Sequence, residues 1–215
     1  MKSVFILVGD YWHSADSIRP IVELLFNKDE WEVIFTEKPE EIYNLSTKTK
    51  LVISFKDPIE NDQIPTDVWC DDKWNQKLFD LVENNGVGLI LAHAALTDLE
   101  KTHLIVKKMI QSMFITHPKQ CTMEFIKRKK HPIMDGVENF MFPEFDEQYQ
   151  MEMIENAEVQ VLADTKTKHG MQPAVWVSEL GKGRICCITP AHTTANLTCD
   201  GFVRVIRNAI NWCVK

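Results

Sequence analysis

An apolar run in the middle of the chain constrains the fold more than any other feature. The run VGLILA (residues 87–92) follows the turn-forming residues Asn84-Asn85-Gly86 and leads directly into His93. An uninterrupted apolar run of this length, bounded by turn residues, is typical of a central parallel strand that is buried on both faces. The sequence therefore predicts an α/β fold in which His93 stands at the carboxyl end of a central strand.

His93 occupies a position that many α/β enzymes use for a nucleophile, on a sharp turn between a strand and the next helix. The small residues Ala92, Ala94 and Ala95 flank it, and we expect them to leave room for the imidazole to reach an open pocket. The chain thus has a reactive position, but the usual nucleophiles of acyl transfer, Ser and Cys, do not occupy it.

Strand-like and helix-like segments alternate through the first half of the chain. Short apolar runs predict strands at residues 4–8, 31–35, 51–55 and 87–92. Helical spacing of apolar residues predicts helices at residues 17–26, 71–84 and 99–113. For the first of these helices, Asp16 is the expected cap and Pro20 is expected within the first turn. Alternation of this kind predicts a parallel sheet with helices on both faces.

The second half is richer in strands. Strand-like segments lie at residues 122–127, 148–153, 158–163, 174–179 and 184–189. The last two are joined by Leu180-Gly181-Lys182-Gly183, a glycine-bearing turn that predicts a β-hairpin. A final helix is predicted at 201–214, with an apolar stripe along one side. Together the segments predict one domain over residues 1–215, a three-layer α/β/α fold whose mostly parallel sheet has an antiparallel extension.

Length and charge exclude several classes of protein. A chain of 215 residues suffices for one well-buried domain, and no linker-like stretch divides it. The net charge of -7 argues against a general nucleic-acid binder, which needs a basic face to displace phosphate counterions. The one basic run, residues 127–130, is interpreted as a solvated strand end.

The cysteines and the apolar runs indicate a cytoplasmic protein. The six cysteines lack CxxC spacing, and most lie in apolar runs, where a free thiol behaves as a small buried hydrophobe. This pattern favours a reducing compartment. The apolar run near the N-terminus is too short for a signal peptide, and no segment approaches the length needed to span a bilayer.

Three histidines and a glutamate follow or precede predicted strands. His13 comes after the first strand, His93 after the central one and His192 after the segment 184–189, while Glu147 directly precedes 148–153. Ligands of open parallel sheets bind beyond the carboxyl ends of the strands, so we expect a shared polar site there. The alternative is that His93 only fills a turn and that His13 is an ordinary loop residue.

Two kinds of chemistry suit such a site. Imidazoles with a carboxylate partner can transfer protons as general acids and bases. The same groups can bind a divalent metal ion such as zinc or manganese, with His13, His93 and His192 as ligands. His117, which follows the helix that leads away from His93, is expected to border the site. Trp12, Trp69 and Trp74 are expected to form an aromatic rim that can stack on a sugar ring. His103 and His169 are expected to lie on the surface, outside the site.

Several segments carry a resemblance to a known family. They are GVGLILAHAA from Gly86, His117-Pro118, HPIMDGVENF from His131, DEQY from Asp146, PAVWVSELGKGRICCITPAH from Pro173 and IRNAINW from Ile206. In this ordered set the sequence resembles the ThuA-like (trehalose-utilisation) family, a branch of the class I glutamine-amidotransferase-like fold. The resemblance implies a flavodoxin-like sheet, a link to sugar metabolism and a polar pocket lined by the motif histidines. It also implies loss of the amidotransferase cysteine, whose place His93 takes.

The leading functional hypothesis is a sugar-processing enzyme, a hydrolase, lyase or isomerase, acting on a sugar or an oxidised sugar. His93, His192 and Glu147 are its expected catalytic groups. The expected contacts to the small-molecule substrate come from His13, Trp12, His117 and Tyr149. The alternative is a non-catalytic sugar- or metabolite-binding protein on the same fold. A glutamine amidotransferase is not expected, because a His side chain cannot form the thioester of that reaction. Whether the chain forms a homo-oligomer is left open.

Overall fold

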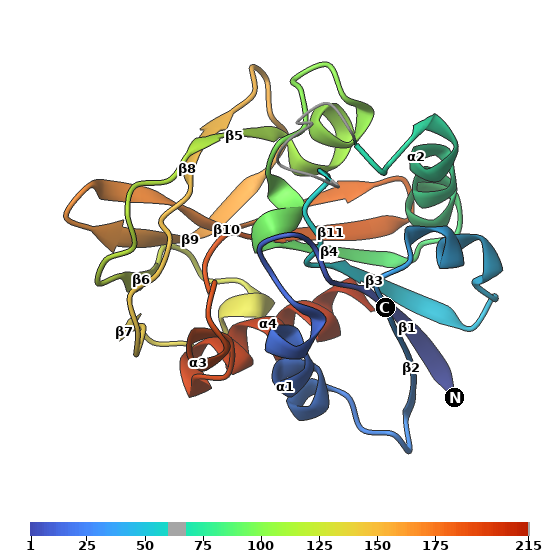
Figure 1. The fold of residues 1–215 in the computed structure, drawn as a ribbon, viewed down its shortest axis with the longest axis horizontal. Coiled ribbons are helices and arrows are strands. Elements are labelled where there is room, and N and C mark those ends of the chain that lie inside the picture. The colour runs from blue at the N-terminus through green and yellow to red at the C-terminus, as the bar shows by residue number, and fades with distance from the viewer. Residues whose placement is uncertain (60–67, 215) are drawn as a thin grey trace.

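The computed structural model describes residues 1–59 and 68–214. Within these residues, nine strands form one sheet with helices on both faces (Figure 1). The strands of this sheet are β1 (Lys2–Leu7), β2 (Trp31–Thr36), β3 (Thr49–Ser54), β4 (Gly88–Ala92), β6 (Glu124–Lys127), β7 (Phe140–Met141), β9 (Gln160–Thr167), β10 (Gly170–Leu180) and β11 (Gly183–Ile188). A separate pair consists of β5 (Ser112–Thr116) and β8 (Gln150–Met153).

The order of the strands identifies the fold. The sheet runs β2-β1-β3-β4-β11-β10-β9-β6-β7. Its first five strands pair in parallel, and their order is that of the flavodoxin-like α/β fold. The remaining four strands pair antiparallel and extend the sheet beyond β11, with the predicted hairpin between β10 and β11. The predicted α/β/α fold with an antiparallel extension is confirmed.

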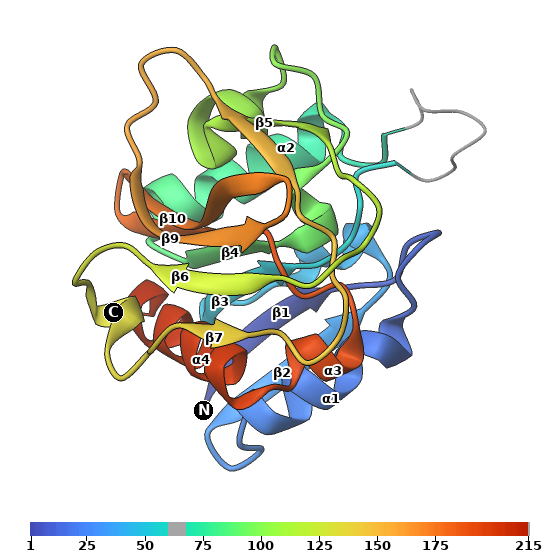
Figure 2. The ribbon, with the colours of Figure 1, turned by 90° about the vertical axis from the view of Figure 1, so that its left-hand side faces the viewer.

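Two apolar cores lie on the two faces of the sheet. Helices α1 (Ala15–Leu25) and α4 (Asp200–Cys213) cover one face, together with the short α3 (Thr194–Leu197). Helix α2 (Asp72–Phe79) and the π-helical turn η2 (Asp80–Asn84) cover the other face. Figure 2 shows the sheet edge-on between these two layers. Because side chains alternate along a strand, successive residues of β1 contribute to opposite cores.

The central strand β4 is buried along its whole length, as the run VGLILA predicts. Helix α4 packs so closely against its first residue that a Cβ on Gly88 would lie 2.6 Å from the carbonyl oxygen of Cys213. Only glycine fits under this helix end, since real Cβ atoms do not approach that closely. Strand β4 also pairs in parallel with β11, so the turns that follow the two strands lie at the same edge of the sheet.

The first helix begins earlier than the sequence predicts. Its cap is Ser14, whose side chain accepts a hydrogen bond from the backbone N–H of Ser17, and the helix starts at Ala15. Asp16 therefore lies inside the first turn and is not the cap. Pro20 is the sixth residue of the helix and lies beyond the first turn, where its missing N–H removes one intrahelical bond.

The predicted helix at 99–113 is correct only in its middle, because the structure is helical at residues 104–110 and not before or after them. A short 3₁₀ turn, η3 (His93–Leu96), is followed by irregular chain and then by the π-helical turn η4 (Val106–Ile110). Gln111 takes a left-handed backbone conformation, with φ of 55°, and ends that turn. Ser112 then begins β5, which pairs with β8. The spacing of apolar residues cannot reveal this strand pairing, because the partner strand lies about forty residues further along the chain.

The remaining short elements are the 3₁₀ turns η1 (Pro39–Asn44) and η5 (Pro132–Met134). All six cysteines are free thiols, and all but Cys199 are buried, as expected of small apolar core residues. Among the described residues, no helix is both long enough and apolar enough to cross a membrane.

Candidate functional site

The structure brings His13, His93 and His192 together at the carboxyl ends of β1, β4 and β11. The Nδ1 atom of His192 lies 3.1 Å from Nε2 of His13 and 3.1 Å from Nε2 of His93. One ring nitrogen of each histidine lies within 4.8 Å of the other two. These strands are neighbours or near-neighbours in the parallel half of the sheet, so the loops after them meet at one edge.

His93 lies on the sharp strand-to-helix turn that the sequence predicts. Its backbone is left-handed, with φ of 49°, a conformation that costs a non-glycine residue energy and recurs at functional sites. Its Nδ1–H donates to the carbonyl oxygen of Thr189 at 2.8 Å. The expectation of an open pocket around His93 is wrong, because the side chain is only 4% exposed. The rings of His13 and His192 cover it, and Tyr149 stacks on it.

His13 is held by Asp10, which lies in the loop between β1 and α1. The Nδ1–H of His13 donates to Oδ1 of Asp10 at 2.9 Å. The same oxygen accepts the backbone N–H groups of Trp12 and His13, so the turn is closed around a single carboxylate. The other carboxylate oxygen accepts the backbone N–H of Asp57, which follows β3. Asp10 thereby fixes both the position and the ring orientation of His13.

His192 is held by Asp146, a carboxylate that is completely buried. Its two oxygens accept the backbone N–H groups of Ala191 and His192, at 2.9 and 3.0 Å. They also accept the side-chain amide of Asn196 at 3.0 Å. Ala191 has φ of 81°, which turns the chain sharply before the histidine. The sequence singles out Glu147 beside Asp146, but the anchoring role of Asp146 has no signal in the sequence.

Glu147 faces the three histidines with one oxygen. Its Oε2 lies 3.4 Å from Nδ1 of His192, 3.6 Å from Nε2 of His93 and 3.9 Å from Nε2 of His117. Its Oε1 accepts a hydrogen bond from the side chain of Gln120 at 3.2 Å. Burial raises the pKa of Glu147, but the interaction with His93 and with the other nearby imidazoles outweighs burial and brings the pKa to about 2. The group is therefore ionised at neutral pH.

Two neighbouring groups, His192 and Tyr149, are neutral at neutral pH. Burial, followed by the charge of His93, lowers the pKa of His192 to about 4. Burial raises the pKa of Tyr149 well above its ordinary value, so its hydroxyl keeps its hydrogen. That hydroxyl lies 3.2 Å from Nε2 of His93, to which it can donate. Neutral imidazole is a base or a metal ligand, and a protonated phenol is a hydrogen-bond donor.

A pocket of about 210 Å³ opens over this cluster. Its lining includes six of the residues that the sequence assigns to the site: Trp12, His13, His117, Glu147, Tyr149 and His192. Of the expected aromatic rim, only Trp12 contributes to this lining. Trp74 is buried in α2, and Trp69 donates its indole N–H to the backbone of Asp57, so the expectation that these two form the rim is wrong.

Four further residues line the pocket that the sequence analysis does not assign to the site: Asp57, Thr97, Asp98 and Phe114. The hydroxyl of Thr97 donates to Oδ2 of Asp57 at 2.7 Å. Burial raises the pKa of Asp57 to about 7, against the lowering effect of hydrogen bonds from Ile59 and Thr97. Asp57 comes shortly after β3, so the rule that ligands gather at strand ends could have pointed to it.

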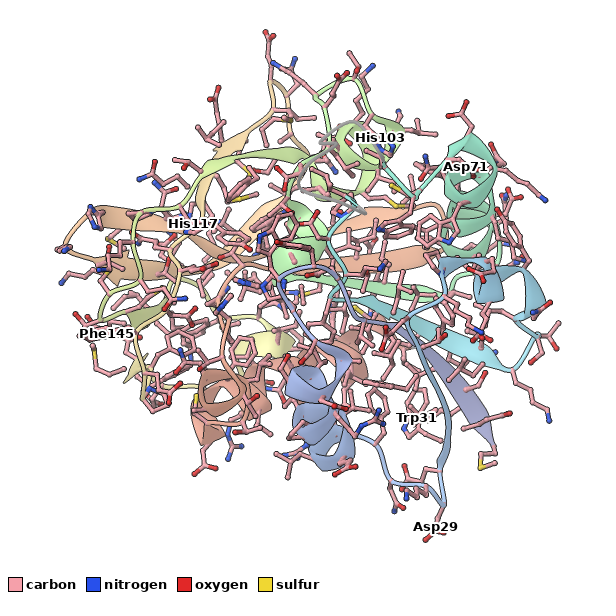
Figure 3. All side chains as sticks on the ribbon, in the orientation of Figure 1. Asp29, Trp31, Asp71, His103, His117 and Phe145 are labelled. Carbon is pink, nitrogen blue, oxygen red and sulfur yellow. The ribbon has the colours of Figure 1, made fainter. Side chains whose placement is uncertain are left out.

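The remaining histidines lie elsewhere. His103 lies with Asp71 on the α2 side of the molecule, apart from His117, as Figure 3 shows. The ring of His131 accepts the backbone N–H of Ile133 and shapes the turn η5. His169 is exposed in the turn between β9 and β10.

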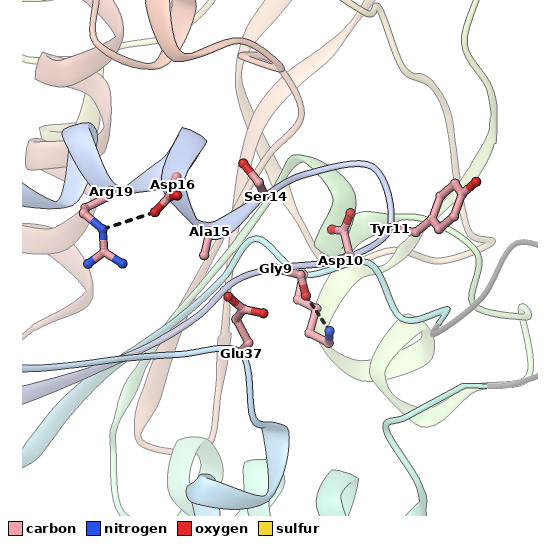
Figure 4. Close-up of a pocket in the computed structure, with 9 residues that line it drawn as sticks. Gly9, Asp10, Tyr11, Ser14, Ala15, Asp16, Arg19 and Glu37 are labelled. Carbon is pink, nitrogen blue, oxygen red and sulfur yellow. Dashed lines mark hydrogen bonds and ion pairs between the residues drawn. The ribbon is translucent and has the colours of Figure 1, made fainter.

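A second, larger pocket of about 470 Å³ lies next to the loop after β1. Figure 4 shows Gly9, Asp10 and Tyr11 on this loop, with Glu37 on another wall. None of the three clustered histidines lines this pocket. The smaller pocket is therefore the candidate site, because the groups that can carry out chemistry face it.

The strand order and the polar pocket at the strand ends define a flavodoxin-like α/β protein with a histidine-rich site. The chain belongs to the ThuA family, described as trehalose utilisation, whose model matches residues 3–213. Comparison with curated proteins gives no match.

Solved structures share the fold. A ThuA-like protein from Parabacteroides merdae is similar with a TM-score of 0.77 and 16% identity, over 100% of this chain and 90% of that one. A cytoplasmic protein from Salmonella typhimurium has a TM-score of 0.67 and 14% identity, over 100% of both chains. A β-galactosidase from Bacillus circulans has a TM-score of 0.66 and 10% identity, over 98% of this chain and 31% of that one. At these identities the likeness shows the fold alone.

Proposed function

We propose that this chain is an enzyme that acts on a sugar or an oxidised sugar in the pocket above the histidine cluster. One observation carries the proposal: three imidazoles and an ionised carboxylate from distant parts of the chain meet at the base of a pocket. Burying such groups costs stability, and proteins keep that arrangement where it serves chemistry. The family description, trehalose utilisation, supports a sugar or sugar derivative as the substrate.

The pocket supplies the contacts that a sugar needs. Trp12 is 45% exposed and can stack on the apolar face of a sugar ring. His117 and the carboxylates of the lining offer hydrogen-bond partners for hydroxyl groups. The antiparallel pair β5–β8 supplies Phe114, which together with Tyr149 forms an aromatic wall.

The reacting groups are those that line the pocket. His192 and Glu147 face it and are the groups that would exchange a proton with a substrate or hold a metal ion against it. His93 lies beneath them, and we assign it a positioning role in proton transfer or a ligand role in metal binding. Both forms of chemistry fit a hydrolase, lyase or isomerase. We place the activity in the cytoplasm, because all six cysteines are free thiols.

The proposal is tested by turnover of trehalose, other disaccharides and their keto derivatives by the purified chain. Glu147→Gln keeps the size of the side chain and removes its charge, so turnover should fall by about a hundredfold or more. His169→Ala removes an exposed imidazole outside the pocket and should leave turnover unchanged. Equal turnover by Glu147→Gln and the unchanged chain would contradict the proposal. Sugar binding without turnover would instead favour a non-catalytic sugar-binding protein.

A further inference from the structure

We propose that His13, His93, His192 and Glu147 form a binding site for one divalent transition-metal ion, and that zinc fits it best. The proposal goes beyond the function proposed above, because it concerns a ligand that binds whether or not a sugar is turned over. It stands on the ring orientations, the spacing and the charges of these four side chains.

The ring orientations of two histidines are fixed from outside the cluster. Nδ1 of His13 faces a carboxylate oxygen of Asp10 at 2.9 Å, and Nδ1 of His93 faces the carbonyl oxygen of Thr189 at 2.8 Å. Both oxygens can only accept, so each Nδ1 carries the hydrogen and each Nε2 has a lone pair. Metal-binding histidines show this arrangement, in which the outer ring nitrogen donates to a carboxylate or a carbonyl group.

The spacing of the nitrogens suits a metal ion. Both Nε2 lone pairs face Nδ1 of His192, each across 3.1 Å, and the three nitrogens lie within 4.8 Å of one another. Zinc–nitrogen bonds of about 2.0–2.1 Å place the nitrogens of a tetrahedral site about 3.3–3.4 Å apart. Shifts of side chains by less than about an ångström would therefore close all three imidazoles around one ion.

A purely hydrogen-bonded cluster is the competing arrangement. A neutral His192 with its hydrogen on Nδ1 can donate to His13 or to His93, but not fully to both. The hydroxyl of Tyr149, 3.2 Å from Nε2 of His93, can donate to that nitrogen instead. This network gives the ring nitrogens hydrogen-bond partners. It leaves Oε2 of Glu147, the oxygen that faces the imidazoles, without a close donor.

The charges around the cluster favour a cation. Oε2 of Glu147 lies 3.4 and 3.6 Å from the nearest imidazole nitrogens, longer than a hydrogen bond, while Gln120 holds Oε1. Within residues 1–59 and 68–214, no Lys or Arg forms an ion pair with Asp10, Asp146 or Glu147. Buried charges in proteins are paired or bind a metal ion, and a cation between the imidazoles and Glu147 would balance this negative charge.

The donor set points to the identity of the ion. Three imidazole nitrogens and one carboxylate oxygen match the ligands of zinc more closely than those of magnesium or calcium, which prefer oxygen. His13, His192 and Glu147 also line the pocket, so an ion held by them would face it. The four side chains complete a tetrahedral zinc site, so a water or substrate molecule from the pocket would enter as a fifth ligand.

The test uses the full chain, stripped of metal with a chelator and then titrated with zinc chloride by calorimetry. We expect one zinc ion per chain. His192→Ala and Glu147→Gln should weaken zinc binding by about a hundredfold or more, since even partners of ligands account for 10–100-fold. His169→Ala removes an exposed imidazole outside the cluster and should bind zinc like the unchanged chain. Absence of stoichiometric binding, or equal binding by all variants, would overturn the proposal.

Cobalt provides a readout on the unchanged chain, which does not depend on whether a variant folds. Cobalt bound by imidazole and carboxylate ligands should give visible bands without the intense near-ultraviolet absorption of thiolate coordination. Strong thiolate bands would place the ion on cysteines and overturn the proposal. Neither experiment contains a sugar, so loss of the proposed enzymatic function would leave this result unaffected, and the reverse also holds.

Discussion

Replacement of Asp146 by Asn tests how the chain holds His192 in the site. The buried carboxylate accepts four N–H groups, two on each oxygen. One oxygen accepts from the backbone of Ala191 and the side chain of Asn196. The other accepts from the backbone of His192 and of Glu147, at 3.0 and 2.8 Å. An amide keeps only one of these two oxygens, so at least one pair of donors loses its acceptor.

The expected loss of stability follows from this count. A hydrogen bond to a charged group contributes about 1.5–3 kcal/mol, so loss of two should lower the free energy of unfolding by about 3–6 kcal/mol. Urea denaturation measures this quantity, with Asp29→Asn as the matched control. Asp29 lies at the exposed tip of the turn before β2 (Figure 3), so its replacement should change stability by less than about 0.5 kcal/mol. A loss below about 1 kcal/mol for Asp146→Asn would refute the anchoring role.

Three further predictions concern packing and titration. Gly88→Ala places a methyl group 2.6 Å from the carbonyl oxygen of Cys213 and should cost about 1–3 kcal/mol in urea denaturation; an unchanged midpoint would contradict the close packing. His93→Ala leaves the buried carbonyl of Thr189 without its donor and should cost about 1–3 kcal/mol, so a neutral effect would show that the imidazole is not needed there. The pKa of Asp57 rises from 3.8 to about 7 on folding, so the folded state binds the extra proton and stability should fall as pH rises from 4 to 7. Asp57→Asn should reduce that slope by up to about 1.4 kcal/mol per pH unit, and an identical slope in both proteins would contradict the assignment.

The sheet could be predicted from the sequence because its signals are local. The run VGLILA is short, apolar and bounded by turn residues, and it forms the central strand β4. The glycine-bearing turn at Gly181 likewise forms the hairpin between β10 and β11. The strand pair β5–β8 could not be predicted, because Gln111 ends the preceding turn through a left-handed backbone that periodicity does not encode. Pairing with a strand far along the chain outweighed the helical pattern.

The convergence of the histidines could be expected from one rule, that parallel strands present their carboxyl ends at the same edge. What holds them in place could not. Asp10 and Asp146 act through backbone N–H groups of tight loops, whose conformation depends on the folded chain. Burial of His93 is also a tertiary effect, since the covering rings come from loops after other strands.

A crystal of the full chain grown with zinc and measured at the zinc absorption edge would locate the bound ion directly. We predict one strong anomalous peak within about 2.0–2.1 Å of Nε2 of His13, Nε2 of His93 and Nδ1 of His192, with Glu147 beside it. Such a peak would show that residues from three separate strand ends act on one ion. Anomalous density at the cysteines or the surface alone, with the three imidazoles still joined by hydrogen bonds, would contradict a metal site at the strand ends.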